Sequence, residues 1–150
     1  MDVRVNDPTD LAAFTRLNLA WIDRYFQVEA SDRKVLDQPA RIIADGGFVL
    51  TLVDEGEVVG CCALLRNGER SFELAKMAVD PAVQGRGLGD RLMLAAVAQA
   101  RSAGADRLDL LTSSKLTVAL ALYRKHGFEQ LPQTCHADYA RCDVVMRRLL

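Results

Sequence analysis

Apolar side chains recur at three- and four-residue intervals in four stretches of the chain, which is the spacing of one face of a helix. They predict helices at about 11–25, 31–44, 88–103 and 117–126. Pro39 interrupts the second stretch, because proline lacks the N–H group that a helix interior requires. A glycine follows each of the last three stretches, as is typical of helix C-termini.

Shorter runs between these helices have the alternation or the continuous apolar character of β-strands. They are residues 1–5, 48–53, 58–65, 71–79, 108–112, 128–131 and 143–150. Turns at 54–57 and at Asn67-Gly68 join three of them into an antiparallel meander. The helix at 88–103 then forms a β-α-β crossover, which makes two strands parallel. We therefore predict one α/β domain over residues 1–150, in which helices cover a mixed, mostly antiparallel sheet with a central β-α-β parallel pair.

A glycine-rich turn, Gln84-Gly85-Arg86-Gly87-Leu88-Gly89, precedes the third helix. Backbone N–H groups at a helix N-terminus have no partner within the helix, and the macrodipole adds about half a positive charge there. The turn therefore predicts a phosphate-binding site, although a strand-to-helix connection without a ligand has the same pattern. Its glycine spacing departs from a Rossmann dinucleotide site. It also departs from a P-loop, which needs Gly-Lys-Ser/Thr where this chain has Gly89-Asp90-Arg91.

Composition narrows the class of protein further. The chain has 19 basic and 20 acidic side chains and a net charge of −1, which gives no general attraction to nucleic acid or anionic membranes. No apolar run approaches the ~20 residues of a membrane span, and the N-terminus lacks the pattern of a leader, so we expect a soluble, cytoplasmic protein. The cysteines at 61, 62, 135 and 142 have neither zinc-site nor disulfide-framework spacing. We expect no metal site and reduced thiols, with Cys61 and Cys62 buried in a strand.

Two motifs together resemble the GNAT superfamily of acyl-CoA-dependent N-acyltransferases. The first is Val79-Asp80-Pro81-x-x-Gln84-Gly85-x-Gly87-x-Gly89. The second is Ala119-x-x-x-Tyr123-x-x-x-Gly127-Phe128, which follows one helix and one strand later. The resemblance covers at least residues 48 to 131. Parts of the sequence also resemble small bacterial members of the family. It implies the GNAT fold and acetyl-CoA as cosubstrate, without a metal.

The resemblance also implies which residues hold the cosubstrate. In the family, the glycine turn binds the pyrophosphate of acyl-CoA through backbone N–H groups, and the preceding strand binds the pantetheine arm. The corresponding residues are Met77, Ala78, Val79, Gln84, Gly85, Arg86, Gly87, Leu88, Gly89 and Asp90. In many relatives, an asparagine early in the helix that carries Tyr123 contacts the cofactor. Residues 113–116 occupy this region here, and their sequence is Ser-Ser-Lys-Leu.

The implied reaction is direct attack of an amine on the thioester. An alkylamine with a pKa near ~10.4 is mostly protonated at neutral pH, so the reaction needs a base. Glu73, at the start of the strand that leads to the cosubstrate, is the candidate base; the alternative is a surface glutamate. Tyr123 matches the family tyrosine beside the CoA sulfur and is the candidate general acid; the alternative is a tyrosine packed against the sheet. The backbone N–H of Ala78 or Val79 is the candidate oxyanion donor.

Candidates for the acceptor side come from the first two helices and a late loop, which shape the amine pocket in relatives. They point to Trp21, Tyr25, Phe26 and Glu29, although core packing explains the aromatic residues equally well. Glu29 and Asp32 also fit solvated capping positions. His126 is expected to be structural. His136, near Tyr139, is either a pocket residue or simply exposed.

These observations leave three functions open. The leading one is an N-acetyltransferase that moves an acetyl group from acetyl-CoA to a primary amine of a small molecule, peptide or protein. The second is a catalytically silent acyl-CoA-binding module that acts as a sensor or structural protein, and the third is a nucleotide-binding regulator. Retention of both Glu73 and Tyr123 favours the enzyme. A homodimer is an open possibility, because dimers are common among relatives.

Overall fold

Seven strands form one sheet in the computed structural model, which describes residues 1–133, 135 and 140–150. In the order of the sheet they are β1 (Asp2–Val5), β2 (Phe48–Asp54), β3 (Glu57–Gly68), β4 (Ser71–Val79), β5 (Arg107–Thr112), β7 (Val144–Leu149) and β6 (Glu129–Gln130). Among these described strands, β4 and β5 pair in parallel and every other pair is antiparallel. The predicted mixed sheet with one parallel pair is confirmed.

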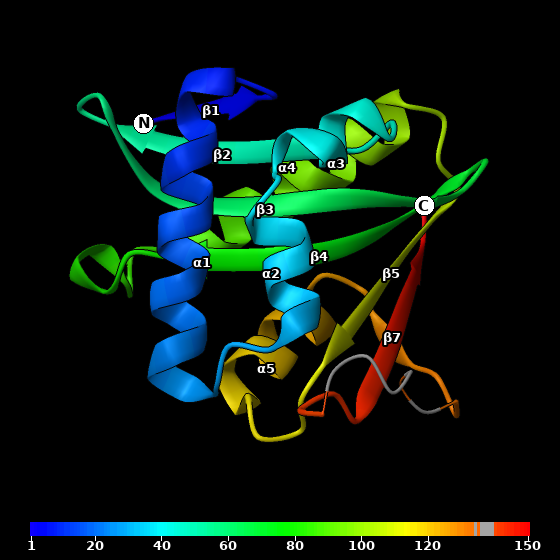
Figure 1. Ribbon diagram of the computed structural model, residues 1–150. Coiled ribbons are helices and arrows are strands. Elements are labelled where there is room, and N and C mark those ends of the chain that lie inside the picture. The colour runs from blue at the N-terminus through cyan, green and yellow to red at the C-terminus, as the bar shows by residue number, and fades with distance from the viewer. Residues whose placement is uncertain (134, 136–139) are drawn as a thin grey trace.

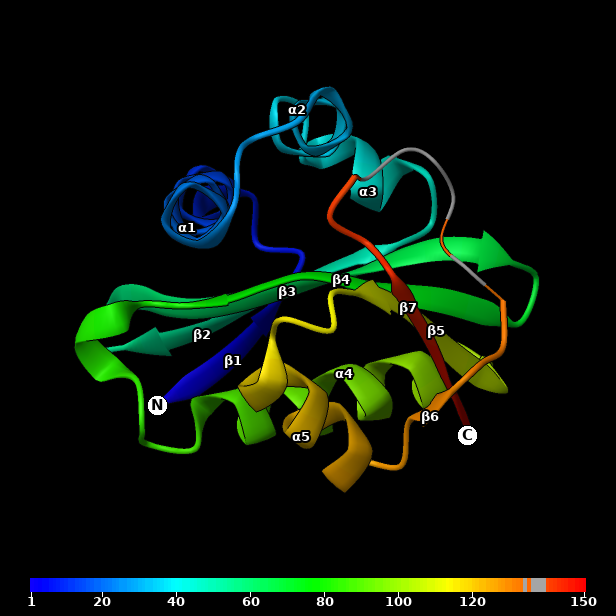
Figure 2. The ribbon, with the colours of Figure 1, turned by 90° about the horizontal axis from the view of Figure 1, so that it is seen from below.

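Helices cover both faces of the sheet, as Figure 2 shows: α1, α2 and α3 lie on one face, and α4 and α5 lie on the other. Their bounds are α1 (Leu11–Tyr25), α2 (Ala30–Leu36), α3 (Ala40–Ala44), α4 (Leu88–Ser102) and α5 (Thr117–Lys125), with short 3-10 helices η1 (Pro8–Asp10) and η2 (Pro81–Val83). Pro39 divides the second predicted helix into α2 and α3, because the residue before a proline disfavours helical backbone. No helix in the described part of the chain is long and apolar enough to cross a membrane.

One predicted turn of the sheet differs from the structure. Asn67 and Gly68 belong to β3, because Gly68 pairs with Ser71 of β4. The turn is therefore formed by residues 69 and 70. The Asn67 side chain accepts a hydrogen bond from Ser71 Oγ at 2.6 Å, which holds this end of the hairpin together. In addition, β7 lies between β5 and β6, an order that local sequence patterns do not encode.

Alternation along the central strands divides the buried core into two parts. Leu50, Leu52 and Leu64 face α4, whereas Val49 and Ala63 face α1. All of them are at most 2% exposed. Because successive side chains of a strand point to opposite faces, β2 and β3 anchor helices on both sides at once. They form the rigid centre from which the functional part of the sheet extends.

The pairing of β4 with β5 covers three residues, from Ser71 to Glu73 on β4 and from Arg107 to Asp109 on β5. Beyond Glu73, β5 and β7 turn away from β4 (Figure 1). One edge of the second half of β4 is therefore left without a partner among the described strands. This divergence opens the sheet at the carboxyl ends of two parallel strands, which is where open α/β sheets bind ligands.

A β-bulge accompanies the divergence. Cys61 pairs with Ala78 and Ala63 pairs with Ala75, so β4 has one more residue than β3 between these pairs. Lys76 lies in the bulge with φ +56°, a left-handed conformation that is uncommon for residues other than glycine. The surrounding structure must therefore hold Lys76 in place.

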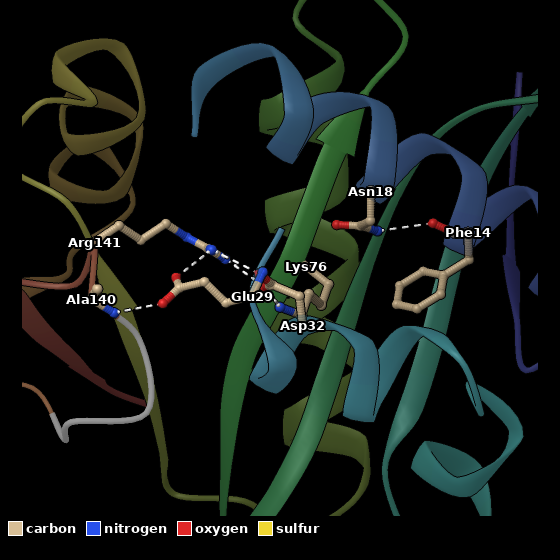
Figure 3. Close-up of polar contacts among 7 residues, drawn as sticks. All are labelled: Phe14, Asn18, Glu29, Asp32, Lys76, Ala140 and Arg141. Carbon is tan, nitrogen blue, oxygen red and sulfur yellow. Dashed lines mark hydrogen bonds and ion pairs between the residues drawn. The ribbon is translucent and has the colours of Figure 1, made fainter. Parts of the chain in front are cut away.

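A buried ionic cluster holds Lys76, as Figure 3 shows. Its Nζ lies 2.8 Å from Asp32 Oδ1, and Arg141 Nη2 lies 2.6 Å from the same oxygen. Arg141 Nη1 contacts both Asp32 Oδ2 at 2.8 Å and Glu29 Oε2 at 2.9 Å. Burial would raise the pKa of Asp32, but the hydrogen bonds from Arg141 and Lys76 hold it well below its usual range. The cluster joins α2, β4 and the segment before β7.

Asp32→Asn should destabilise the protein by about 3–5 kcal/mol at pH 7, because it leaves two buried cations without their shared carboxylate. The folded-state pKa of Asp32 is below its unfolded value of 3.8, so this contribution is present above about pH 4 and is lost as the pH falls towards the folded pKa. Urea unfolding should therefore give a smaller difference between wild type and variant at pH 3 than at pH 7.

Asp37→Asn is the matched control for this substitution. Asp37 lies at the end of the same helix and pairs with Arg33 at 3.7 Å, but both side chains are more than half exposed. We expect this variant to change the free energy of unfolding by less than about 0.5 kcal/mol. Equal effects of the two substitutions would contradict the role given to Asp32.

Candidate active site

Two adjoining cavities occupy the opening beside β4. The first has a volume of about 110 Å³ and lies between α1, β4 and the segment before β7. The second has a volume of about 600 Å³ and lies between the glycine turn, the end of β4 and the start of α5. Both are lined by Trp21, Met77, Leu116 and Tyr123. The two cavities are therefore adjacent and share Tyr123 in their walls.

The glycine turn forms one end of the second cavity, where Gln84, Gly85 and Gly87 line the wall. Gly85 has φ +83° and Gly87 has φ +72°, and no atom lies within 4 Å of a Cβ built on either one. Gly87 is the N-cap of α4, and the first backbone hydrogen bond of the helix runs from Arg91 N to Gly87 O. The backbone here is left-handed, open and rich in N–H groups, so it fits an anion such as pyrophosphate.

Glycine is needed at position 89 for a different physical reason than at positions 85 and 87. A Cβ at Gly89 would lie 3.1 Å from Leu122 Cδ2 on α5, so this position allows α4 and α5 to approach closely. Leu88, the neighbouring residue, is 4% exposed and belongs to the core, while its backbone lines the cavity region. The predicted motif therefore combines two roles, an open turn and a tight contact between helices.

Two charged residues at this end of the site, Asp90 and Arg86, differ in whether they line the cavity. Asp90 lines the second cavity, and its carboxylate pairs with His126 Nε2 at 2.7 Å and Lys125 Nζ at 2.9 Å. The hydrogen bond from His126 lowers the pKa of Asp90. His126 thereby links α5 to α4, which agrees with its expected structural role. Arg86 is exposed and is not among the residues that line either cavity.

The end of β4 forms the wall between the turn and Tyr123. Met77, Ala78 and Val79 all line the second cavity. Because β5 has already diverged, the peptide groups on that edge of β4 are not used by a neighbouring described strand. An extended ligand can hydrogen-bond to such an edge as an added strand does. The predicted pantetheine-binding residues and the predicted turn are thus brought together in one cavity.

Tyr123 lies on α5 at the junction of the two cavities. Its ring packs edge-on against Phe128, with 6.2 Å between ring centroids, and contacts the core beneath the sheet. Burial raises the pKa of the Tyr123 hydroxyl to about 12. The group is therefore protonated at neutral pH and can act as a proton donor.

Glu73 lines the first cavity from the last position of β4 that pairs with β5, opposite Leu65 on β3 and Asp109 on β5. Its side chain is half-buried and makes contacts of its own. The strand divergence begins directly after Glu73. Glu73 therefore lies where β4 and β5 begin to diverge, and it lines the first cavity together with Tyr123.

The aromatic residues of α1 and the loop after it form the outer wall. Trp21 contacts Tyr25 and Phe26, with ring centroids 5.2 and 6.1 Å apart. Trp21 and Phe26 line the first cavity, and Tyr25 lines the second. Glu29 is the N-cap of α2 and forms a capping box with Asp32, as expected. The expectation that Asp32 is solvated is wrong, because Asp32 is fully buried by Lys76 and Arg141.

Four functional candidates were missed from the sequence. Asn18, Lys76 and Arg141 line the first cavity, and Lys115 lines the second. A signal exists for Asn18, which interrupts the apolar row formed by Phe14 and Ile22 at intervals of four residues. Arg141 gave no local signal, because its partners lie more than a hundred residues earlier in the chain. His136 and Tyr139 lie outside the described residues.

The cysteines divide into two kinds. Cys61 and Cys62 are fully buried, and burial raises the pKa of the Cys61 thiol to about 12, so they are packing residues as expected. Cys135 and Cys142 form a disulfide, which corrects the expectation of four reduced thiols. The reason is that the Cα atoms of Cys135 and Cys142 lie 5.8 Å apart, within bonding range. Among the described residues, no group of three His, Cys, Asp or Glu side chains could hold a metal.

Comparison with known proteins agrees with this geometry. The sequence profile of the acetyltransferase (GNAT) family matches residues 15–128. The N-acetyltransferase YjgM of Escherichia coli is 39% identical over 123 residues, which cover 77% of this chain and 72% of that protein.

Solved structures agree at the level of the fold. An acetyltransferase of the GNAT family from Staphylococcus aureus superimposes with a TM-score of 0.85 over 99% of each chain, at 16% identity. The yncA protein of Salmonella typhimurium, solved with its cofactor acetyl-CoA, has a TM-score of 0.77 and 25% identity over 100% of this chain and 94% of its own. The chain therefore belongs to the acetyltransferase (GNAT) family.

Proposed function

We propose that this protein is an N-acetyltransferase that moves an acetyl group from acetyl-CoA to a primary amine by direct attack. The observation that carries the proposal is the continuity of the site: an open, left-handed glycine turn, an unpaired edge of β4 and a protonated tyrosine follow one another along a single cavity. The smaller cavity beyond Tyr123 has room for an acceptor and contains Glu73. Acetyl-CoA in the related yncA structure supports the choice of donor.

Several residues of the second cavity fit the donor. The N–H groups from Gln84 to Asp90 surround the seat for pyrophosphate, where the bare Cα atoms of Gly85 and Gly87 allow close approach. Lys115 lines the same cavity and supplies a cation for phosphate oxygens. The exposed edge at Met77, Ala78 and Val79 fits the amide groups of pantetheine. This arrangement would place the thioester near Tyr123.

The chemistry then needs two proton transfers. The amine nitrogen bonds to the carbonyl carbon while the carbon–sulfur bond breaks, one amine proton passes to Glu73 and Tyr123 donates its proton to the departing sulfur. The N–H of Ala78 or Val79 stabilises the negative charge on the carbonyl oxygen. An alkylamine at pH 7 is unprotonated in roughly one molecule in a few thousand, so a nearby carboxylate contributes substantially. Protons on Glu73 and Tyr123 then exchange with solvent.

Gly87→Val should lower the affinity for acetyl-CoA at least about tenfold, or about 1.4 kcal/mol, because the side chain enters the phosphate seat. Gly104→Val is the matched control, since Gly104 follows the other end of α4 with φ +84° and equally open surroundings. Both variants bear similar backbone strain, and calorimetric titration with acetyl-CoA should detect a loss in Gly87→Val alone. Equal affinities would exclude the turn as the phosphate site.

Tyr123→Phe should reduce kcat about 100-fold with little change in the KM for acetyl-CoA, because it removes a proton donor rather than a binding group. The measurement is release of the CoA thiol against a panel of primary amines. Since the pKa of Tyr123 is raised to about 12, the wild-type rate should show no fall on the alkaline side due to this group below about pH 10. Tyr25→Phe, which alters another tyrosine of the second cavity, is the control and should retain kcat.

Glu73→Gln should lower kcat/KM for the amine about 100-fold at pH 7. The loss should shrink as the pH rises towards the pKa of the amine, because deprotonation in solution then replaces the base. Glu69→Gln removes the same charge from the exposed turn before β4 and should be silent. If the protein binds acetyl-CoA but releases no thiol with any amine, a silent acyl-CoA-binding module is the correct function.

A further inference from the structure

The first cavity is small and of mixed character. Its volume of about 110 Å³ is below the roughly 150 Å³ of an apolar protein cavity that holds one benzene molecule. Trp21, Ile22 and Phe26 supply apolar walls from the α1 side, and Leu111 supplies one from the end of β5. Glu73 supplies a carboxylate. The part of an acceptor that enters this cavity must therefore be a short hydrocarbon group that carries the reactive nitrogen.

Two cations in the wall superficially suggest a site for the carboxylate of an amino acid. However, Lys76 and Arg141 both bind Asp32, at 2.8 and 2.6 Å, and Arg141 also binds Glu29 at 2.9 Å. With Glu73, the described residues of the cavity and its supporting cluster contain three carboxylates and two cations. A second carboxylate would have to draw a cation away from the fully buried Asp32, which is unfavourable. The balance favours a positively charged or neutral group.

Asn18 adds a fixed hydrogen-bond acceptor to this cavity. The side chain is 1% exposed, and its Nδ2 donates to Phe14 O at 3.0 Å and to Cys61 Sγ at 3.4 Å. These two bonds use both N–H groups and fix the orientation of the amide. Oδ1 points away from Phe14 towards the side where Lys76 and Arg141 lie (Figure 3), and no described residue donates to it. Asn18 lines the first cavity, so this acceptor is complementary to a ligand N–H.

We propose that the acceptor is a small primary amine with no carboxylate on the carbon that bears the nitrogen, and that Asn18 Oδ1 accepts a hydrogen bond from this amine. The inference rests on the proposed acetyl transfer and adds the class of acceptor to it. Asn18 orients the nitrogen, Glu73 takes its proton, and the aromatic wall contacts its hydrocarbon group. The α-amino groups of amino acids are excluded because Lys76 and Arg141, the cations that would bind the adjacent carboxylate, are already neutralised.

Matched pairs that differ by one carboxylate test the class of acceptor: isoamylamine with leucine, and isobutylamine with valine. We expect kcat/KM for each amine to be at least about tenfold higher than for its amino acid. Thermal shift with CoA present provides a second readout, in which amines raise the Tm more than amino acids. Equal or better use of amino acids overturns the inference while acetyl transfer stands.

The same experiment separates this inference from the proposed function. If amines bind more tightly than amino acids but no pair is acetylated, the proposed reaction fails and the acceptor class stands. If neither class binds or reacts, the inference is overturned. Both readouts use the unaltered protein, so neither depends on the folding of a variant.

Asn18→Leu tests the hydrogen bond itself. The variant should raise the KM for the amine roughly three- to tenfold, which is the loss of one hydrogen bond, while the KM for acetyl-CoA stays within about twofold. Thr15→Val is the control, because Thr15 lies on the same helix, lines neither cavity and donates its hydroxyl to Leu36 O at 2.8 Å. An unchanged amine KM in Asn18→Leu, or an equal rise in Thr15→Val, overturns the role of Asn18.

Discussion

The parallel hydrogen bonding between β4 and β5 extends over three residue pairs and then stops, and every functional element described above depends on that limit. If the pairing continued, β5 would use the peptide groups at Met77 and Val79 and would fill the space that the two cavities occupy. The bulge at Lys76 alters the course of β4 at the same point. An open sheet edge is ordinarily a liability in a protein. Here the edge lines the two cavities, whose walls also include residues of α1 and α5.

The ionic cluster around Asp32 compensates for the structural cost of the opening. A lysine at positive φ in the middle of a strand is unfavourable, and its long side chain crosses to α2, where a fully buried carboxylate receives it. Arg141 joins the same carboxylate from the far side of the first cavity. The cluster thus connects elements on both sides of the split without filling it. It also removes the free charge of both cations, so one arrangement stabilises the fold and restricts the ligand.

The sequence predicted those features that depend on neighbouring residues. The turn at Gly85 and Gly87 could be recognised because left-handed backbone and close approach both require glycine. Tyr123 was identified through the family resemblance, by its position four residues before Gly127. The contacts of Asp32 were not predictable, because Lys76 and Arg141 are 44 and 109 residues away along the chain. The disulfide between Cys135 and Cys142 depends on a Cα separation of 5.8 Å, which the spacing of these residues along the chain does not reveal. Asn18 could in principle have been identified from the sequence, because it is a polar residue on a buried helical face.

Gly89 has a consequence for the length of donor that the site accepts. It touches Leu122, and these two residues are the immediate neighbours of the phosphate seat and of Tyr123. Asp90, His126 and Lys125 reinforce the same contact between α4 and α5. The interval from the proposed phosphate seat to the tyrosine hydroxyl thus depends on this contact between α4 and α5. On the proposed function, the protein measures the arm between pyrophosphate and sulfur, and a donor with a shorter or longer arm would present its carbonyl carbon out of register with the acid.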